Sequence, residues 1–125
     1  MIGIDLVHIP SFAEQLAMPG SRFEQVFSVA ELRVAHAKPD RATYLAGRWA
    51  AKEAFIKAWD NTLFGHEPRI NTVNWSEISV DQDRYGRTRI VLSGAIRESC
   101  EYKNIPVSIS HDGEYATAIV QLPLN

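Results

Sequence analysis

The 125-residue chain has a single cysteine, no surplus of one charge and no long apolar run. One cysteine, Cys100, excludes an internal disulfide and a metal site built from several cysteines. Lys and Arg number 13 and Asp and Glu 15, so the chain lacks the basic surplus of a general nucleic-acid binder. No uncharged stretch approaches the roughly 18 residues of a membrane span, and the first residues lack the basic and apolar regions of a secretory signal. We therefore expect a cytoplasmic protein with no nucleic-acid or membrane partner.

The sequence also lacks internal repeats and the common glycine-rich phosphate loops. A 46% hydrophobic and 22% charged composition is ordinary for a globular protein. The length suits one hydrophobic core, so we expect one domain over residues 1–125. A chain this small is also a candidate for sites completed by partner chains.

Apolar periodicity and turn residues predict an α+β fold with a long central helix. Strands are expected over residues 2–9, 78–81, 87–92, 105–110 and 115–122, and helices over 12–16, 41–59 and 94–103. Two Ser–Glu pairs, Ser11 with Glu14 and Ser28 with Glu31, have the spacing of a helix capping box. Turns are expected at Tyr85-Gly86 and Asp112-Gly113, which would pair the later strands into antiparallel hairpins.

The longest predicted helix has Asp40 as its N-cap and two contrasting faces. Bulky residues recur on one side and small residues on nearly the opposite side, as the helical spacing of Leu45, Trp49, Ile56 and Trp59 against Gly47, Ala50, Ala54 and Ala58 shows. Such a helix is expected to be packed on both sides. The first strand, whose apolar residues alternate only loosely, is also expected to be covered on both faces.

The same helix carries four charged residues, Arg48, Lys52, Glu53 and Lys57. On spacing alone, Glu53 and Lys57 form an ordinary surface salt bridge worth a few tenths of a kcal/mol. However, the helix is expected to be covered on most sides, and Lys52 projects into the bulky stripe, where it needs a partner. Three cations and one carboxylate in a buried setting would be satisfied by a polyphosphate with a divalent metal.

Asp5 lies in a run of Ile, Leu and Val, where a carboxylate is unfavourable unless it is paired or bound to metal. Either it points to water from an edge strand, or it faces Glu53. In the second case the two carboxylates suit Mg²⁺, which takes one or two protein carboxylates together with substrate phosphates. His111, at the end of a strand, is either a structural turn residue or part of the same site. The other histidines show no zinc-ligand spacing.

Three segments in order resemble the 4′-phosphopantetheinyl transferases of the small, single-domain type, the holo-(acyl-carrier-protein) synthases. They are Gly3-Ile4-Asp5-Leu6-Val7; Trp49-Ala50-Ala51-Lys52-Glu53-Ala54-Phe55-Ile56-Lys57, preceded by Arg48; and Val107-Ser108-Ile109-Ser110-His111 followed by Tyr115-Ala116. The resemblance covers nearly the whole chain. It implies transfer of the 4′-phosphopantetheine arm of coenzyme A to a serine of an apo acyl carrier protein or carrier domain, in fatty acid biosynthesis, with release of adenosine 3′,5′-bisphosphate.

The resemblance also implies roles for individual residues. Asp5 and Glu53 would hold Mg²⁺ and Lys57 would contact the pyrophosphate, which makes these three the expected catalytic residues. Arg48 and Lys52 would bind nucleotide phosphate or serve the structure, and His111 would lie near the nucleotide. Glu53 or a water on the metal would take the proton of the carrier serine. The family further implies a homotrimer with coenzyme A sites at subunit interfaces, which the hairpin arginines Arg84, Arg87 and Arg89 could reach if they are not simply solvated.

Some positions depart from the family pattern. His8 stands where the family often has Glu, and Val7 occupies the place of a further acid in larger relatives. The first helix, with Glu14 and Gln15, is less basic than expected for docking an acidic carrier, so the carrier could instead be a domain of a large synthase. A coenzyme A or nucleotide-binding module without transfer chemistry, and a structural subunit whose charged helix is an interface, remain alternatives.

Overall fold

The computed structural model describes residues 1–123 and contains five strands and four α-helices in an α+β arrangement. The strands are β1 Ile2–His8, β2 Ile78–Gln82, β3 Thr88–Leu92, β4 Ile105–Asp112 and β5 Tyr115–Gln121. The α-helices are α1 Ile9–Ala17, α2 Val29–His36, α3 Arg41–Asn61 and α4 Gly94–Ser99, with 3₁₀ turns η1 Phe23–Val26 and η2 Trp75–Glu77. No helix in this described part of the chain combines the length and apolar character of a membrane span.

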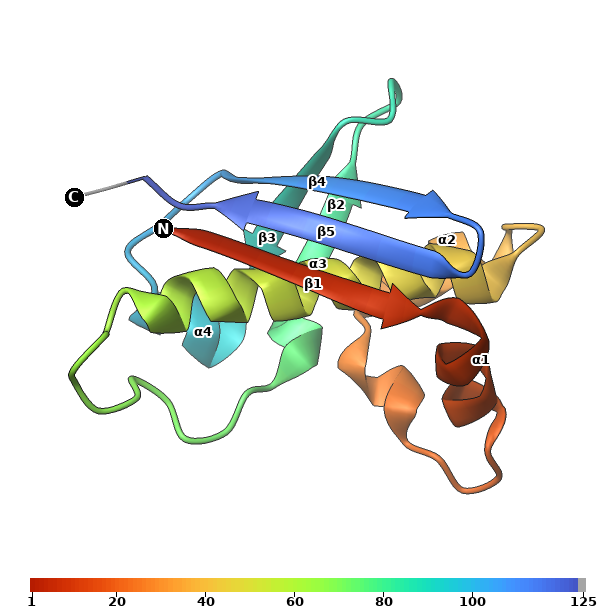
Figure 1. Cartoon of the computed structure of the whole chain (residues 1–125), viewed down its shortest axis with the longest axis horizontal. Coiled ribbons are helices and arrows are strands. Elements are labelled where there is room, and N and C mark those ends of the chain that lie inside the picture. Colours follow the sequence, from red (N-terminus) through yellow and green to blue (C-terminus); the bar gives the residue numbers. More distant parts are fainter. Residues whose placement is uncertain (124–125) are drawn as a thin grey trace.

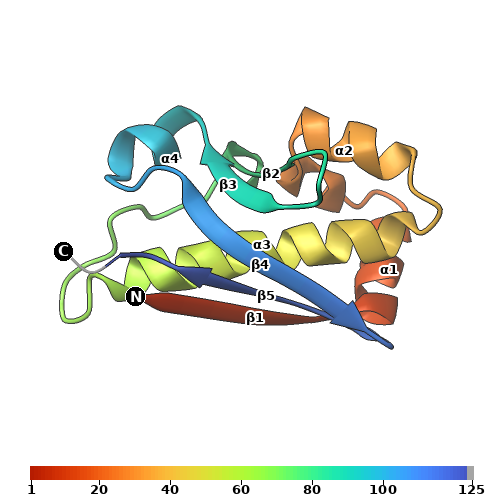
Figure 2. The same ribbon diagram turned by 90° about the horizontal axis from the view of Figure 1, so that it is seen from above.

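All five strands form one antiparallel sheet in the order β1-β5-β4-β3-β2. Figures 1 and 2 show that the sheet curls around the long helix α3, with β1, β5 and β4 on one side and β3 and β2 reaching round to the other. The two ends of the described chain meet, because Met1 and Leu122 exchange backbone hydrogen bonds of 2.9 and 2.7 Å. The predicted α+β architecture with a central helix is confirmed.

The small-residue face of α3 is what allows β1 to approach so closely. A Cβ added to Gly3 would lie 1.8 Å from the carbonyl oxygen of Ala54, and one added to Gly47 would lie 2.9 Å from Ile109. Any larger residue at position 3 would therefore push β1 away from the helix. The bulky face packs on the other side against an aromatic cluster of Phe12, Phe23, Phe27, Trp49 and Trp75.

The opposite face of β1 is not covered within one chain. Ile2, Ile4 and Leu6 are 58%, 60% and 64% exposed, while the alternate residues Gly3, Asp5 and Val7 are buried. The expectation that both faces of this strand are covered is therefore wrong for the single chain. Three large apolar side chains in a row form an exposed patch of the kind that marks an interface.

Most predicted boundaries differ from the structure by a few residues, and three of these differences have a clear physical cause. α1 begins at Ile9 and is capped by His8, whose Nδ1 accepts from the Ser11 backbone N–H, so Ser11 is not the cap. α4 ends at Ser99 rather than near residue 103, because the chain must turn into β4, and Asn104 makes that turn with a φ of 55°. The last hairpin turns at Gly113 and Glu114, one residue later than expected, since Asp112 still pairs with Tyr115.

Candidate active site

Asp5, Glu53 and Lys57 meet where β1 crosses α3. Asp5 is on the inward face of β1 and only 8% exposed. The Lys57 ammonium donates to Asp5 Oδ1 at 2.8 Å and to the Ile4 carbonyl oxygen at 3.1 Å. Glu53, one turn earlier on α3, is half-buried, and its carboxyl interacts with that of Asp5. Of the two interpretations of Asp5, the one in which it faces Glu53 is the arrangement found.

The carboxyl groups of Asp5 and Glu53 lie so close together that ionising both is unfavourable. Burial, followed by the nearby Asp5 carboxyl, raises the pKa of Glu53 to about 8, and the Lys57 ammonium only partly opposes this. The hydrogen bond to Asp5 raises the pKa of Lys57, so this lysine stays charged. The cluster thus keeps one extra proton on Glu53 unless another cation approaches.

The donor set of this cluster fits a hard divalent cation. Asp5 Oδ2 is buried and has no hydrogen-bond partner among residues 1–123, which is costly for a carboxylate oxygen. Two carboxylates with nothing softer beside them are the ligands that suit Mg²⁺, which completes its shell with water and phosphate oxygens. Within the described residues, no three His, Cys, Asp or Glu side chains gather as metal ligands. Asp5 and Glu53 would therefore supply at most a two-carboxylate site.

Arg48 and His111 line a different hollow, a cavity of about 380 Å³ between α3, β4 and the end of β2. The Arg48 guanidinium lies 4.1 Å from the centre of the Tyr44 ring and donates to Gln82 Oε1 at 2.9 Å. Its Nε is buried with no partner in the described part of the chain. Lys38 also lines this cavity, and so does one acid, Asp40, whose carboxylate accepts from the Thr43 backbone N–H and hydroxyl. Three cationic or protonatable side chains and an unused buried donor suit an anionic ligand such as a phosphate.

These two groups of residues lie on different flanks of α3. Glu53 follows Arg48 by five residues, which places them about 140° apart around an α-helix. Glu53 and Lys57 face β1, whereas Arg48 faces Gln82 of β2. One chain therefore does not bring Arg48 and His111 to the carboxylate pair.

Lys52 is buried, and its ammonium contacts only other groups of the protein. Its side chain has no exposed surface, and its ammonium forms an ion pair with Glu31 at 2.7 Å and donates to the carbonyl oxygens of Trp75 and Ile78. Glu31, 1% exposed, also accepts from the backbone N–H groups of Ser28 and Val80 at 2.9 Å each. All three donors of the Lys52 ammonium therefore have partners within the chain, which leaves none for a nucleotide phosphate. Of the two roles considered for Lys52, the structural one matches its contacts.

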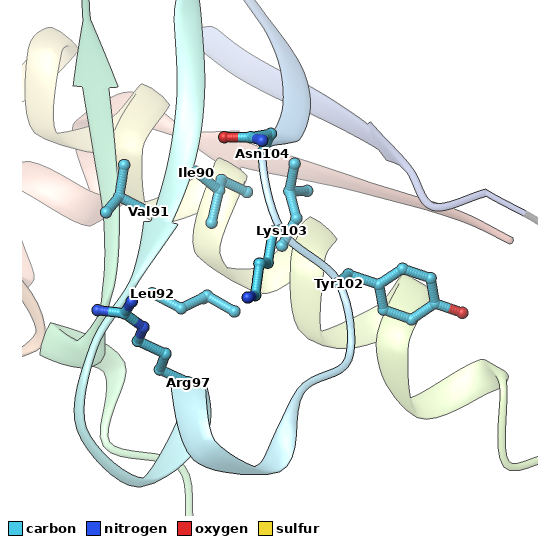
Figure 3. Close-up of a pocket in the computed structure, with 8 residues that line it drawn as sticks. Ile90, Val91, Leu92, Arg97, Tyr102, Lys103 and Asn104 are labelled. Carbon is cyan, nitrogen blue, oxygen red and sulfur yellow. The ribbon is translucent and has the colours of Figure 1, made fainter.

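The remaining cations lie apart from the carboxylate pair. Arg87 donates to Asp83 Oδ2 across the β2–β3 turn, and Arg84 stacks on Tyr85, so both side chains make their contacts within this exposed turn. Figure 3 shows another cavity, of about 250 Å³, where Arg97 and Lys103 extend toward the end of β3. None of the predicted site residues lines that cavity.

Comparisons with known proteins show the family to which the chain belongs. A family model described as the 4′-phosphopantetheinyl transferase superfamily matches residues 1–120. The chain belongs to this superfamily. The holo-[acyl-carrier-protein] synthase of Corynebacterium efficiens is 49% identical over 129 residues, covering 97% of this chain and 92% of that protein. The protein of the same name from Mycobacterium tuberculosis is 44% identical over 122 residues, covering 97% and 94%.

Solved structures of the superfamily have the same fold. An ACPS–CoA complex from Chronobacterium ammoniagenes has a TM-score of 0.90 and 51% identity, covering 96% of this chain and 93% of that one. The holo-[acyl-carrier-protein] synthase of Helicobacter pylori in complex with coenzyme A has a TM-score of 0.75 and 27% identity, covering 96% and 97%. The resemblance drawn from the three sequence segments is confirmed.

Sequence reasoning missed three residues that position this superfamily member's charged groups. Glu31 was assigned only to the helix cap, yet it is also the counter-ion of Lys52. Tyr44 and Gln82, which hold the Arg48 guanidinium, were not singled out. Tyr44 lies four residues before Arg48 on the same helix, a spacing that could have indicated the contact. Gln82 is 34 positions away and carries no such signal.

Proposed function

We propose that this protein transfers the 4′-phosphopantetheine group of coenzyme A to a serine of an apo acyl carrier protein or carrier domain. The observation that supports this best is the cluster of Asp5, Glu53 and Lys57 in a chain of the phosphopantetheinyl transferase superfamily. Similar proteins carry the name holo-[acyl-carrier-protein] synthase, and two solved relatives contain coenzyme A. A role in fatty acid biosynthesis in the cytoplasm is part of the same proposal.

The reaction forms one bond and breaks one. The serine Oγ of the carrier attacks the phosphorus that bears the pantetheine arm, and the bond from that phosphorus to the bridging pyrophosphate oxygen breaks. Adenosine 3′,5′-bisphosphate leaves, and the serine loses its proton. Lys57, a charged donor at the pyrophosphate, stabilises the negative charge that develops on the leaving oxygen. We take Glu53, once deprotonated, as the candidate acceptor of the serine proton.

Asp5 and Glu53 are the residues that would hold Mg²⁺, because the single Lys57 ammonium balances only one of the two carboxylates and Asp5 Oδ2 has no partner among residues 1–123. When bound, this ion supplies charge neutralisation at the pyrophosphate. Asp5 has a second task, since its Oδ1 accepts from the Lys57 ammonium and so fixes the position of that donor. The loss of Asp5 would therefore affect both metal binding and the orientation of Lys57.

We also propose a homotrimer in which each coenzyme A lies between two subunits. Arg48 and His111 suit the nucleotide phosphates, but they lie on the flank of α3 away from Glu53, so a neighbouring copy would have to combine the two halves. The exposed apolar face of β1, formed by Ile2, Ile4 and Leu6, offers the surface for such contacts. If so, the Arg48→Met and Lys57→Ala variants, each impaired alone, should regain part of the activity when they are mixed.

The test is the intact mass of an apo acyl carrier protein after incubation with this protein, coenzyme A and Mg²⁺, with EDTA as the control. We expect a gain of one phosphopantetheine group that EDTA abolishes. Carrier domains from large synthases are included, because the first helix carries no basic residue within Ile9–Ala17. If every carrier stays unmodified while coenzyme A binds, the protein is a binding module and the transfer reaction is excluded.

A further inference from the structure

The cavity drawn in Figure 3 lies where two neighbouring strands of the sheet separate. Toward the end of β3, its pairing with β4 stops at Ile90 opposite Ile105. In the same register Val91 would face Asn104, but no backbone hydrogen bond joins these two residues. The chain turns away at Asn104, whose φ is 55°. The gap that this turn leaves beside β3 is the cavity, with a volume of about 250 Å³.

The inner walls of this cavity are apolar. Ile90, Leu92 and Ile105 line it and belong to the hydrophobic core, and Val91, which is 50% exposed, also lines it. An apolar cavity of about 150 Å³ binds benzene, which has six carbon atoms. A volume of about 250 Å³ therefore admits an apolar chain of roughly eight carbon atoms.

Both charged residues that line the cavity are cations. Arg97, in the last turn of α4, and Lys103, shortly before β4, form no ion pair within the described part of the chain. In Figure 3 both side chains reach the Leu92 end of the cavity, whereas Ile90 and Asn104 lie at the other end. An anionic group at the Leu92 end would therefore meet a guanidinium and an ammonium together.

The acids nearby in the sequence do not neutralise these two cations. Glu101 already pairs with Arg69, at 2.8 Å. Glu98 directly follows Arg97 on α4, and adjacent residues of a helix do not face each other. No acid among residues 1–123 lines the cavity. The positive charge at the Leu92 end is therefore left for a ligand.

We propose that this cavity binds a medium-chain carboxylate, with its carboxylate held by Arg97 and Lys103 and its chain along Ile90 and Ile105. The anionic head matches the two cations and the chain matches the apolar walls. Inorganic phosphate would match the cations alone, and a neutral chain would match the walls alone. None of the residues assigned above to metal, pyrophosphate or nucleotide phosphate lines the cavity. The inference therefore does not depend on the transfer reaction.

Isothermal titration calorimetry of the 125-residue chain with octanoate tests this binding. Octanamide, which has the same chain without the charge, and inorganic phosphate, which has charge without a chain, are titrated in the same buffer. We expect one octanoate per chain with a Kd of at most about 1 mM, as suits a ligand of about ten non-hydrogen atoms. Octanamide and phosphate should each bind at least about five-fold less tightly.

The charges are tested with Arg97→Gln and Lys103→Gln, two substitutions of exposed side chains that leave the core untouched. Each should weaken octanoate binding at least about five-fold. Arg33→Gln, at an exposed cation of α2, is the matched control and should bind octanoate as the wild type does. In amide NMR spectra, octanoate should shift the signals of residues 90–92 and 103–105 most.

No saturable binding up to about 10 mM octanoate overturns the inference, and so does binding that neither Gln variant weakens. Equal binding of octanamide excludes recognition of the anion, and equal binding of phosphate excludes recognition of the chain. NMR shifts that instead follow α3, or displacement of octanoate by coenzyme A, would put the ligand at the proposed transfer site and also overturn the inference. The transferase proposal stands or falls separately, on the mass of the carrier.

Discussion

Replacing Glu31 with Gln should destabilise the protein far more than an ordinary surface substitution. Glu31 and Lys52 form an ion pair with almost no exposed surface, and Gln keeps the shape and one acceptor for the backbone N–H groups. The variant therefore leaves the Lys52 charge buried without a counter-ion. Breaking such a pair from one side costs about 3–5 kcal/mol. At about 4 °C per kcal/mol for a domain of this length, Tm should fall by about 12–20 °C.

The stability that Glu31→Gln loses should depend on pH in a defined direction. Burial already lowers the pKa of Lys52, and Glu31 opposes that shift, so its removal lowers the pKa further. A base whose folded-state pKa lies below its unfolded value of 10.5 destabilises the fold while protonated, and this cost disappears as pH rises above the folded pKa. The Glu31→Gln defect should therefore shrink between about pH 7 and pH 10.

Urea unfolding at both pH values and a fixed protein concentration measures this effect. Glu98→Gln is the control, because Glu98 is an exposed acid on α4 whose loss should change stability by less than about 0.5 kcal/mol. A loss in Glu31→Gln no larger than in Glu98→Gln, or one that grows as pH rises, would refute the reasoning.

Three further predictions concern the proposed active site and assembly. Lys57→Ala should lower turnover about 10²–10³-fold. It should lower stability by no more than about 1 kcal/mol, because the Lys57 side chain is 57% exposed. Arg33→Ala is the control, and matched losses of activity and Tm in Lys57→Ala would contradict the proposed role of Lys57. Burial and a neighbouring carboxyl raise the metal-free pKa of Glu53 from 4.5 to about 8, so its stabilising contribution is complete below 4.5 and lost as pH rises through about 8. Mg²⁺ should therefore raise Tm more at about pH 9 than at about pH 6, and equal shifts at both would count against Glu53 as a ligand. Ile4→Asp should reduce the mass found by analytical ultracentrifugation to that of one chain, whereas Val29→Asp should not; an unchanged mass for Ile4→Asp would exclude the β1 face as the interface.

Local signals predicted most of the fold. The Ser28–Glu31 capping box and the Asp40 N-cap are both present, because caps depend on residues a few positions apart. The small and bulky faces of α3 predicted its central place between the sheet and an aromatic layer. The length of α4 was overestimated, since its end depends on the turn at Asn104 rather than on helical periodicity.

The sequence predicted some contacts of the candidate site and missed others. Asp5 was identified because an acid among apolar residues needs a partner, but the sequence left open whether it points to water or faces Glu53, and the structure has the second arrangement. The partner of Lys52 could not be read from the chain, because Glu31 reaches it only after α2 packs beside α3. The position of Arg48 and Glu53 on different flanks of α3, in contrast, could be predicted from their five-residue spacing on one helix.

Two lysines of α3 donate to backbone carbonyl oxygens of the strands at the two borders of the sheet. β1 and β2 are its two edge strands, and edge strands present unpaired backbone groups to which a foreign strand can add. Lys57 donates to the Ile4 carbonyl oxygen at one edge and Lys52 to the Ile78 carbonyl oxygen at the other, where Glu31 also accepts from Val80. These hydrogen bonds occupy one backbone group of β1 and two of β2, which leaves fewer groups for a foreign strand to pair with. In the proposed homotrimer, copies would then meet through the face of β1 formed by Ile2, Ile4 and Leu6 rather than edge to edge.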